Sequence, residues 1–380
     1  MAQSGNNVWK YAVLVLIVGA SVEALGFVAG KVLAQQGLLY DPVPAATSYT
    51  TYLAERDPLL GWPAPATRGH GEIDATGSRL VPAYPDPATR NCVAIFGDSF
   101  TWGEEVSPED AYGNVLARAL GCRVANFGVG GYGTDQALLR YEQLQPEARV
   151  IVLGFFSDDI VRDVNQDRAF LNNRSLGLKP RFRVTNGALE LVPLPTMTED
   201  QYAHIGTLAA TLLPYDYFRP GGPSGLVALR FPFTISAIRA LWQYRVRAAL
   251  RHEASYAEFY RPGNSSGALE VTVAIMRRFV ATAKGRGQAP LVLLIPDVKD
   301  LEWLRAHGTL PYQPLIDSLS ANAVPFVSAA QSLNGYLGAK PPCALYFRCR
   351  GSHFRPDGYR ELAKVVERAI QERGLLQVHP

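Results

Sequence analysis

Ser99 and His353 are residues whose types and settings suit nucleophilic catalysis. Ser99 follows an apolar run that ends in Phe96-Gly97-Asp98, so it falls in a turn directly after a predicted strand. His353 lies in a loop just ahead of the last helical pattern, and histidine is the natural base for a serine hydroxyl. A Gly-Asp-Ser turn alone is often structural. Together the two residues predict acyl transfer through a serine nucleophile.

A glycine-rich turn follows the second predicted strand, at residues 126–134 (NFGVGGYGT). Backbone N–H groups in such a turn, that of Gly131 among them, can approach an oxyanion. The turn lacks the Lys-Ser/Thr ending of a phosphate loop. A simple close turn is the alternative.

Short, continuous apolar runs alternate with helical patterns through most of the chain. This is the pattern of parallel strands covered on both faces by helices, and it predicts a doubly wound, flavodoxin-like α/β fold with three layers and a five-stranded parallel sheet. The strands are expected at 92–96, 123–127, 150–155, 291–295 and 325–328, and the helices at 111–120, 135–144, 268–284, 312–321 and 358–372. Ser99 and the glycine turn then lie at the carboxyl edge of the sheet, where α/β sites form.

The alternation breaks at residues 167–264, which we interpret as an inserted cap on the same domain. Asn186-Gly187 between two alternating segments predicts a hairpin over 179–192, and residues 234–250 are typical of a basic helix. The predicted organisation is a tail at 1–10, a membrane helix at 11–30, an extended proline-rich arm at 31–90, and the α/β domain at 91–375.

Residues 11–30 are apolar except for Glu23 and are long enough to cross a hydrocarbon core of about 30 Å. A signal peptide cleaved near Val22-Glu23-Ala24 is the alternative, and we favour a retained anchor. Gly19, Glu23, Gly26 and Gly30 share one helical face, which predicts packing against a helix of an integral-membrane partner. If the segment is cleaved, Glu23 never enters a bilayer.

Charge and cysteine content bear on three further questions: nucleic-acid binding, metal binding and disulfide formation. The net charge is +3 with no long basic run, so nucleic acid is excluded as a partner. The four cysteines lack the spacing of a zinc site, and no metal or cofactor is expected. Cys92 and Cys122 begin strands that are neighbours in a 2-1-3 sheet order, and Cys343 and Cys349 can close a short loop before His353. Buried free thiols are the alternative. With export, we expect disulfides and a single-pass inner-membrane protein whose α/β domain faces the periplasm.

These motifs resemble the SGNH/GDSL hydrolase family over residues 90–165 and 285–372. The resemblance implies Ser99 as nucleophile, the Ser99 amide and Gly131 as oxyanion donors, and His353 as general base. It also implies an activity among esterases, carbohydrate deacetylases and membrane-anchored O-acetyltransferases, acting on an acylated carbohydrate or lipid.

Two positions depart from the family pattern. Asp158 stands where the family has an asparagine oxyanion donor, and with a register shift of one Ser157 takes that place. Arg350 stands where the family has its triad acid, three residues before His353, and Asp297 is an alternative acid. Because the two changes have opposite charges, we hypothesise that Arg350 and Asp158 pair across the former active site.

Two functions therefore remain open. The first is a membrane-anchored, exported serine esterase or acyl-ester hydrolase using Ser99 and His353, with an O-acyltransferase acting on an exported glycan as a variant. The second is a catalytically silent accessory subunit of a membrane complex, held by the 11–30 helix.

Overall fold

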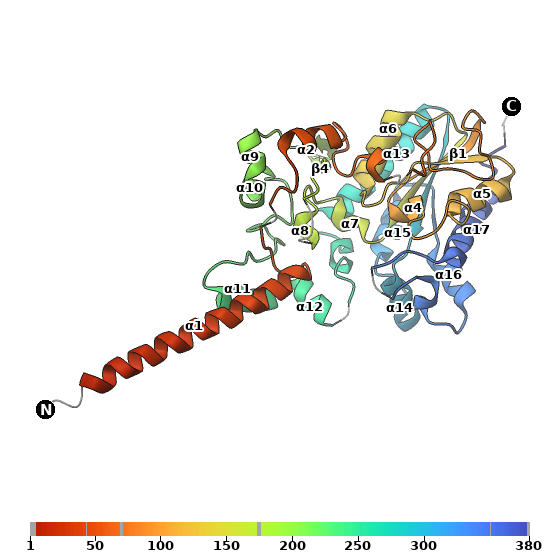
Figure 1. The fold of residues 1–380 in the computed structure, drawn as a ribbon. Helices are drawn as coiled ribbons and strands as arrows, with labels where there is room; N and C mark the ends of the chain where they lie inside the picture. Colours follow the sequence, from red (N-terminus) through yellow and green to blue (C-terminus); the bar gives the residue numbers. More distant parts are fainter. Residues whose placement is uncertain are drawn as a thin grey trace. The chain divides into compact units, whose positions relative to one another are not determined.

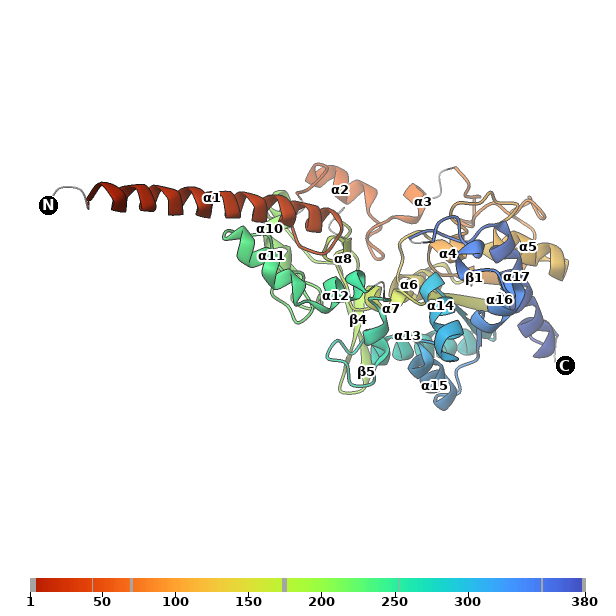
Figure 2. The same cartoon turned by 90° about the horizontal axis from the view of Figure 1, so that it is seen from below.

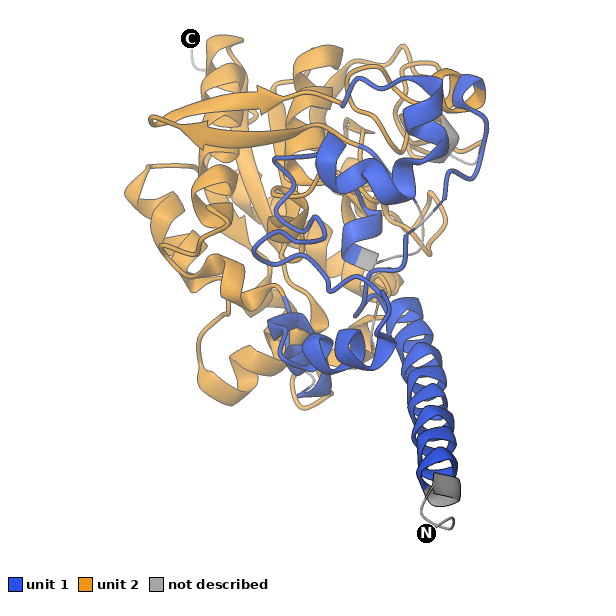
Figure 3. Ribbon diagram, turned by 90° about the vertical axis from the view of Figure 1, so that its left-hand side faces the viewer, with its two compact units in different colours: residues 1–50, 167–178, 195–255 blue, residues 51–166, 179–194, 256–380 orange. Residues whose placement is uncertain are grey.

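The computed structural model describes residues 5–377 apart from 43, 69–70, 173–175, 252 and 350. The chain divides into two compact units (Figure 3). Unit 1 comprises residues 1–50, 167–178 and 195–255, and unit 2 comprises residues 51–166, 179–194 and 256–380. The predicted insertion is thus shared between the units: most of it groups with the N-terminal residues, while residues 179–194 and 256–264 belong with the sheet.

Unit 2 is built on a parallel sheet between helices, with β1 labelled in Figure 1. The sheet has five strands in the order β2-β1-β3-β6-β7. Its strands are β1 Asn91–Phe96, β2 Arg123–Asn126, β3 Val150–Phe156, β6 Ala289–Ile295 and β7 Phe326–Ser328. Val93 is opposite Val124 of β2 and Val150 of β3, so β1 pairs in parallel on both sides. The predicted fold class and the 2-1-3 order are confirmed.

Helices cover both faces of the sheet. α5 (Tyr112–Leu120) packs against α17 (Pro356–Glu372), which also packs against α16 (Ala330–Leu337). α13 (Ala268–Gly285) contacts α6 (Thr134–Leu144) and α15 (Gln313–Ala321) and so forms the other layer. The remaining helices of unit 2 are α3 Pro65–Arg68, α4 Ser99–Trp102, α7 Asp159–Arg162, η1 Ala257–Tyr260, α14 Val298–His307 and η2 Pro342–Leu345, and α2 Tyr49–Glu55 begins in unit 1.

The predicted hairpin is present as β4 (Arg181–Thr185) paired antiparallel with β5 (Ala188–Val192). The turn residues Asn186 and Gly187 both have positive φ, at 51° and 79°. This is the conformation that makes Asn-Gly the preferred tight hairpin turn.

Unit 1 is helical, with α1 Gly5–Gln35, α8 Ala169–Asn172, α9 Glu199–Ala203, α10 Ile205–Leu212, α11 Phe233–Leu241 and α12 Tyr244–Leu250. The prediction of one basic helix over 234–250 is wrong, because α11 and α12 are separate helices. Gln243 is extended between them, and its side chain bonds the Val227 N–H at 3.2 Å and the Gly225 carbonyl at 2.6 Å. These bonds hold the chain out of a continuous helix.

α1 is longer than the predicted 11–30 segment, and Val8–Gln35 has the length and hydropathy to cross a membrane. The predicted face of Gly19, Glu23, Gly26 and Gly30 contacts residues 229–234 of the same chain at three of its four positions. A Cβ added to Gly26 would meet the Thr234 backbone at 2.7 Å, and one added to Gly30 would meet Leu229 at 2.3 Å. Glu23 accepts a hydrogen bond from the Phe233 amide. Gly19 has no described atom within 4 Å of such a Cβ, and a partner helix from another protein stays a prediction.

The structure joins Cys92 to Cys122 and Cys343 to Cys349. The Cα atoms of the pairs lie 6.0 Å and 4.8 Å apart. The first bridge connects the starts of two neighbouring strands, β1 and β2. The second closes the loop that precedes His353.

A buried ion pair joins Lys179, at the start of the hairpin, to Asp135 in the first turn of α6, and neither side chain is exposed. Lys179→Met would leave the Asp135 carboxylate buried without a cation, so we expect a loss of about 3–5 kcal/mol in the free energy of unfolding. Urea unfolding of the full-length protein in detergent, followed by tryptophan fluorescence, measures it.

Two controls belong to this prediction. Arg183→Met breaks the half-exposed pair of Arg183 with Glu190 and should cost less than about 1 kcal/mol. The double variant Lys179→Met/Asp135→Asn should regain much of the lost stability, because no unpaired buried charge remains. A double variant less stable than Lys179→Met alone would contradict the assignment.

Candidate active site

The turn after β1 presents Ser99 as the first residue of α4. Asp98 caps this helix, because its carboxylate accepts hydrogen bonds from the amides of Phe100 at 2.9 Å and Thr101 at 3.4 Å. The turn is tight: a Cβ added to Gly97 would lie 2.1 Å from the Thr101 hydroxyl. Ser99 Oγ donates to Asp98 Oδ2 at 3.5 Å, and the N–H of Ser99 opens the helix without an intrahelical partner.

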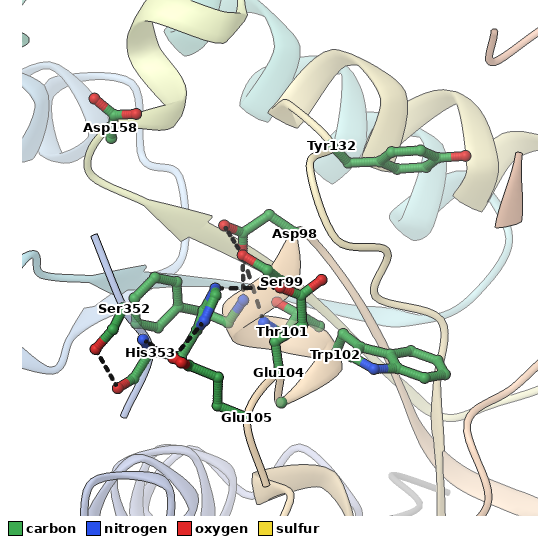
Figure 4. Close-up of polar contacts among 12 residues, drawn as sticks. Asp98, Ser99, Thr101, Trp102, Glu104, Glu105, Tyr132, Asp158, Ser352 and His353 are labelled. Carbon is green, nitrogen blue, oxygen red and sulfur yellow. Dashed lines mark hydrogen bonds and ion pairs between the residues drawn. The ribbon is translucent and has the colours of Figure 1, made fainter. Parts of the chain in front are cut away.

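His353 is delivered by the loop between η2 and α17. The Cys343–Cys349 disulfide and a bridge between Tyr346 and Phe354 shape this loop, and the Tyr346 hydroxyl ties it to the Pro296 carbonyl at 3.0 Å. The His353 ring packs on Phe100, the residue after Ser99, with ring centroids 4.9 Å apart. Figure 4 shows the imidazole beside Ser99. The two predicted residues are therefore brought together although 254 positions separate them in the sequence.

Glu105 holds the histidine in place. Its Oε2 lies 3.1 Å from His353 Nδ1 and accepts the His353 backbone N–H at 2.7 Å. Its other oxygen lies 3.2 Å from Arg348 Nη2. Burial acts to raise the pKa of Glu105, but the hydrogen bonds and charge of His353, together with Arg348, outweigh it and hold that pKa below its ordinary value. Glu105 is thus an ionised acceptor on the Nδ1 side of the ring.

The backbone of Glu105 is in the left-handed region, with φ at +66°. This conformation is costly for a residue with a side chain and is typical of glycine. Strain of this kind persists where the surroundings enforce it, and it concentrates at functional sites. Here the bonds to His353 supply that enforcement.

Glu104 lies on the opposite side of the imidazole. Its Oε2 is 3.6 Å from His353 Nε2, and a Cβ added to Gly130 would lie 1.8 Å from its Oε1. The carboxylate therefore occupies space between Nε2 and the glycine-rich turn. Among the described residues, Ser99 Oγ makes no hydrogen bond to His353.

The glycine-rich turn after β2 packs against α4. Asn126 fixes it, because its side chain donates to the Thr101 carbonyl at 2.8 Å and accepts the Gly128 N–H at 3.0 Å. A Cβ on Gly128 would lie 2.4 Å from the backbone nitrogen of Trp102. Gly131 has φ at +90°, and no hydrogen bond from its amide is present in the described part of the chain. The turn thus offers a second backbone donor near the α4 N-terminus.

The turn after β3 carries Ser157 and Asp158. Ser157 is buried, and its hydroxyl accepts the Asp297 N–H at 3.1 Å. Asp158 Oδ2 lies 4.0 Å from Arg162 Nη2 and points away from Ser99 in Figure 4. Neither side chain bonds Ser99 among the described contacts. Arg350 lies outside the described residues, and with it the proposed Arg350–Asp158 pair.

Arg162 links this turn to the turn that carries Ser99. Its Nη1 lies 2.6 Å from Asp159 and 3.4 Å from Asp98, and donates to the Tyr132 carbonyl at 2.8 Å. Burial raises the pKa of Asp98, while the charges of Arg162 and of the nearby His353 oppose the rise. Arg162 therefore fixes three of the turns at the sheet edge relative to one another.

Asp297, the alternative acid, is engaged elsewhere. It caps α14 through the Lys299 amide at 2.9 Å, and burial raises its pKa to about 6. The carboxylate beside His353 is Glu105 instead. Groups of His, Cys, Asp and Glu suited to a metal ion do not occur among the described residues.

The GDSL-like Lipase/Acylhydrolase family matches residues 95–361, more than half of the chain. The chain belongs to this family. No curated protein matches the sequence. Solved structures similar to it include a catalytic mutant of an acetylxylan esterase from Geobacillus stearothermophilus, at 14% identity, 74% coverage of this chain, 94% of that chain and a TM-score of 0.38. An inhibitor-bound aryl esterase of M. smegmatis is 15% identical, with 76% and 100% coverage and a TM-score of 0.33.

The sequence analysis of this GDSL-like chain missed Glu104, Glu105 and Arg162. The signal was present for the first two, since adjacent carboxylates follow Ser99 by five and six positions while the expected acid position holds Arg350. The contact with His353 could not be predicted, because it depends on the left-handed backbone at Glu105 and on where the loop from 346 to 354 lies.

Glu104→Ala should increase the reactivity of Ser99, because it removes a carboxylate that competes with the serine hydroxyl for the space beside His353 Nε2. A charge contact at a part-exposed site is worth about 0.5–1 kcal/mol, and losing it corresponds to an increase of about 2- to 5-fold. The measurement is the rate of covalent labelling by a fluorophosphonate probe. Glu109→Ala, in the exposed part of the same segment, is the matched control. Slower labelling of Glu104→Ala than of the control would refute the competition.

Proposed function

We propose that this GDSL-like protein is a serine ester hydrolase, with Ser99 as nucleophile and His353 as base. The observation that carries the proposal is the Glu105 carboxylate 3.1 Å from His353 Nδ1, on a ring packed beside the Ser99 turn. A carboxylate at Nδ1 selects the tautomer whose Nε2 can accept a proton, and it stabilises the imidazolium that then forms. The substrate class is an acyl ester, as in an acylated carbohydrate or lipid.

The chemistry follows from these groups. Ser99 Oγ attacks the acyl carbonyl and its proton passes to His353 Nε2, while Nδ1–H remains bonded to Glu105. The amides of Ser99 and Gly131 stabilise the oxyanion. The intermediate collapses to an acyl-serine, and the departing alcohol takes the proton from Nε2. Water, deprotonated by His353, then releases the carboxylic acid and restores Ser99.

Glu104 must leave Nε2 for this cycle to begin. Its side chain is one-third exposed and lies in the turn after α4, so rotation into solvent requires no change in the sheet. A bound acyl group would occupy the vacated space next to the glycine turn. The resting contact explains why Ser99 bonds Asp98 and not His353.

The proposed setting is the cytoplasmic membrane, with α1 as a single-pass anchor and the α/β domain on the extracytoplasmic side. α1 supports the anchor, since its apolar surface is largely exposed. The pairs Cys92–Cys122 and Cys343–Cys349 support the exported side, because disulfides persist in oxidising compartments.

A catalytically silent accessory subunit is the second candidate. The observation that favours it is the Glu104 carboxylate beside His353 Nε2, together with the missing Ser99 to His353 hydrogen bond in the described chain. The two candidates differ in whether Ser99 can be activated at all.

Fluorophosphonate labelling of the full-length protein in membranes decides between them. We expect labelling of the native protein, its loss in Ser99→Ala, and no change in Ser107→Ala, an exposed serine of the same segment. Hydrolysis of p-nitrophenyl acetate should likewise be present in the native protein and in Ser107→Ala and lost in Ser99→Ala. Absence of labelling in both the native protein and Glu104→Ala would reject the hydrolase and leave the accessory role.

Glu105→Gly removes the carboxylate that contacts His353 and also relieves the left-handed backbone strain at this position. The variant therefore separates the effect of Glu105 on activity from its effect on stability. We expect kcat to fall by about 10²- to 10⁴-fold with KM little changed, because His353 loses its orienting carboxylate. We expect the melting temperature to stay equal or to rise. Glycine adopts the left-handed backbone without strain, which stabilises the folded protein by about 1 kcal/mol.

Gln145→Gly is the matched control, since Gln145 also has positive φ, at +46°, and caps α6. It should relieve similar strain and leave kcat unchanged. Full activity in Glu105→Gly would show that Glu105 does not position the histidine.

A further inference from the structure

Residues 231–242 of unit 1, FPFTISAIRALW, contain a single charged residue, Arg239. They include α11, whose apolar residues are not confined to one stripe. Ser236 and Ala240 are buried on one side, and Ala240 belongs to a small core with Ala34 and Leu39. Large apolar residues on the side of a helix that faces away from its own core mark a contact with protein or with a membrane.

The other side of this segment is uncovered in the structure. Phe231 and Trp242 are 73% and 75% exposed, and Ile235, Ile238 and Leu241 are about half exposed. The spacing of 235, 238 and 242 places these three residues along one face of α11, and Phe231 lies in the segment just before the helix. The exposure excludes the protein core as the setting of this face.

α11 lies alongside α1, as Figures 1 and 2 both show. Phe27 and Phe233 meet edge to face, with ring centroids 5.0 Å apart. Between the helices runs an open apolar groove of about 410 Å³, lined by α1 residues from Val22 to Leu33 and by α11 residues from Thr234 to Leu241. The uncovered face of α11 is therefore continuous with the apolar surface of the proposed anchor.

Glu23 makes the pairing suited to an apolar medium. Its Oε2 accepts the Phe233 N–H at 2.5 Å and the Thr234 N–H at 3.5 Å, and Thr234 Oγ1 donates to the Val22 carbonyl at 3.2 Å. The first residue before α11, Pro232, offers no side-chain cap. Glu23 supplies that cap, and the helix N-terminus in turn stabilises the carboxylate. The Glu23 carboxylate and the free amides of α11 therefore pair with each other, and neither is left without a hydrogen-bond partner in lipid, where that would be costly.

Length and charge place the segment at the membrane surface. The nine residues of α11 at about 1.5 Å each extend about 14 Å, which is too short for a hydrocarbon core of about 30 Å and typical of an interfacial segment. Arg230, Arg239, Arg247 and Arg251 are exposed around it, as expected where anionic headgroups begin. The 28 residues of Val8–Gln35 extend about 42 Å, so α1 can span the core and still continue beside α11 at the interface.

We propose that residues 231–242 form a membrane-interface segment whose uncovered face and groove take the acyl chains of the bilayer, with the flanking arginines among anionic headgroups. The segment and the second half of α1 then enter one leaflet as a pair locked by Glu23. The proposal rests on the membrane anchoring proposed above and is independent of esterase activity.

Spin labelling of the full-length protein tests this. All four cysteines are in disulfides, so one added cysteine gives one label site. Ile238→Cys reports on α11, Val15→Cys on the anchor, and Tyr336→Cys on an exposed site of the α/β unit. Each is placed in vesicles of phosphatidylcholine and phosphatidylglycerol. We expect labels at 238 and 15 to collide with oxygen and not with a water-soluble nickel chelate, and the label at 336 to show the reverse.

The other outcomes overturn the proposal in distinguishable ways. A label at 238 that is accessible to the chelate while 15 is not would place α11 in water and leave the anchor intact. Chelate access at both sites would overturn the anchor as well. Protection of 238 from both reagents would mean that a protein, such as a second copy of this chain, covers the face.

A matched pair of variants tests the locking of α11 to α1. Gly26→Leu inserts a side chain where α11 is in contact, whereas Gly19→Leu inserts one where the described residues leave space. We expect the label at 238 to become more mobile in Gly26→Leu and in Glu23→Ala, and to be unchanged in Gly19→Leu. Equal spectra in all three would overturn the pairing.

Discussion

The parallel pairing of β1 with both β2 and β3 is the constraint on which the candidate site depends. Parallel strands end at the same edge of a sheet, so the turns that follow these three strands meet there. Those turns carry Ser99, Gly131 and Asp158. Burial of the strands on both faces fixes their register, and Arg162 then joins the turns through Asp98, Asp159 and the Tyr132 carbonyl.

The histidine reaches this edge from a loop and needs its own support. In this chain the support comes from Glu105, six residues after Ser99, so the segment that carries Ser99 also provides the carboxylate that contacts the His353 ring. The arrangement stores backbone strain at a residue that would be glycine if stability alone decided. The neighbouring Glu104 lies on the other side of the imidazole, beside Nε2, where it occupies space next to the glycine-rich turn. Two adjacent carboxylates therefore act on the two nitrogens of one ring.

The same rule of pairing polar groups governs the N-terminal unit. Glu23 is costly in an apolar helix unless it is satisfied, and the free amides at the start of α11 are costly unless they are capped. Their contact resolves both needs within one chain. It also explains why Gly26 is small, since the Thr234 backbone approaches it closely.

The sequence by itself determined the fold class and the hairpin, and it indicated Ser99 and His353 as a candidate pair. These follow from local periodicity, from turn chemistry and from the rule that parallel strands share an edge. Only the tertiary structure decided that Glu105 orients His353, that Gln243 divides a predicted helix, and that the Glu23 face packs on α11. Each of these depends on contacts between segments far apart in the chain, or on a backbone conformation that local sequence disfavours and distant hydrogen bonds enforce.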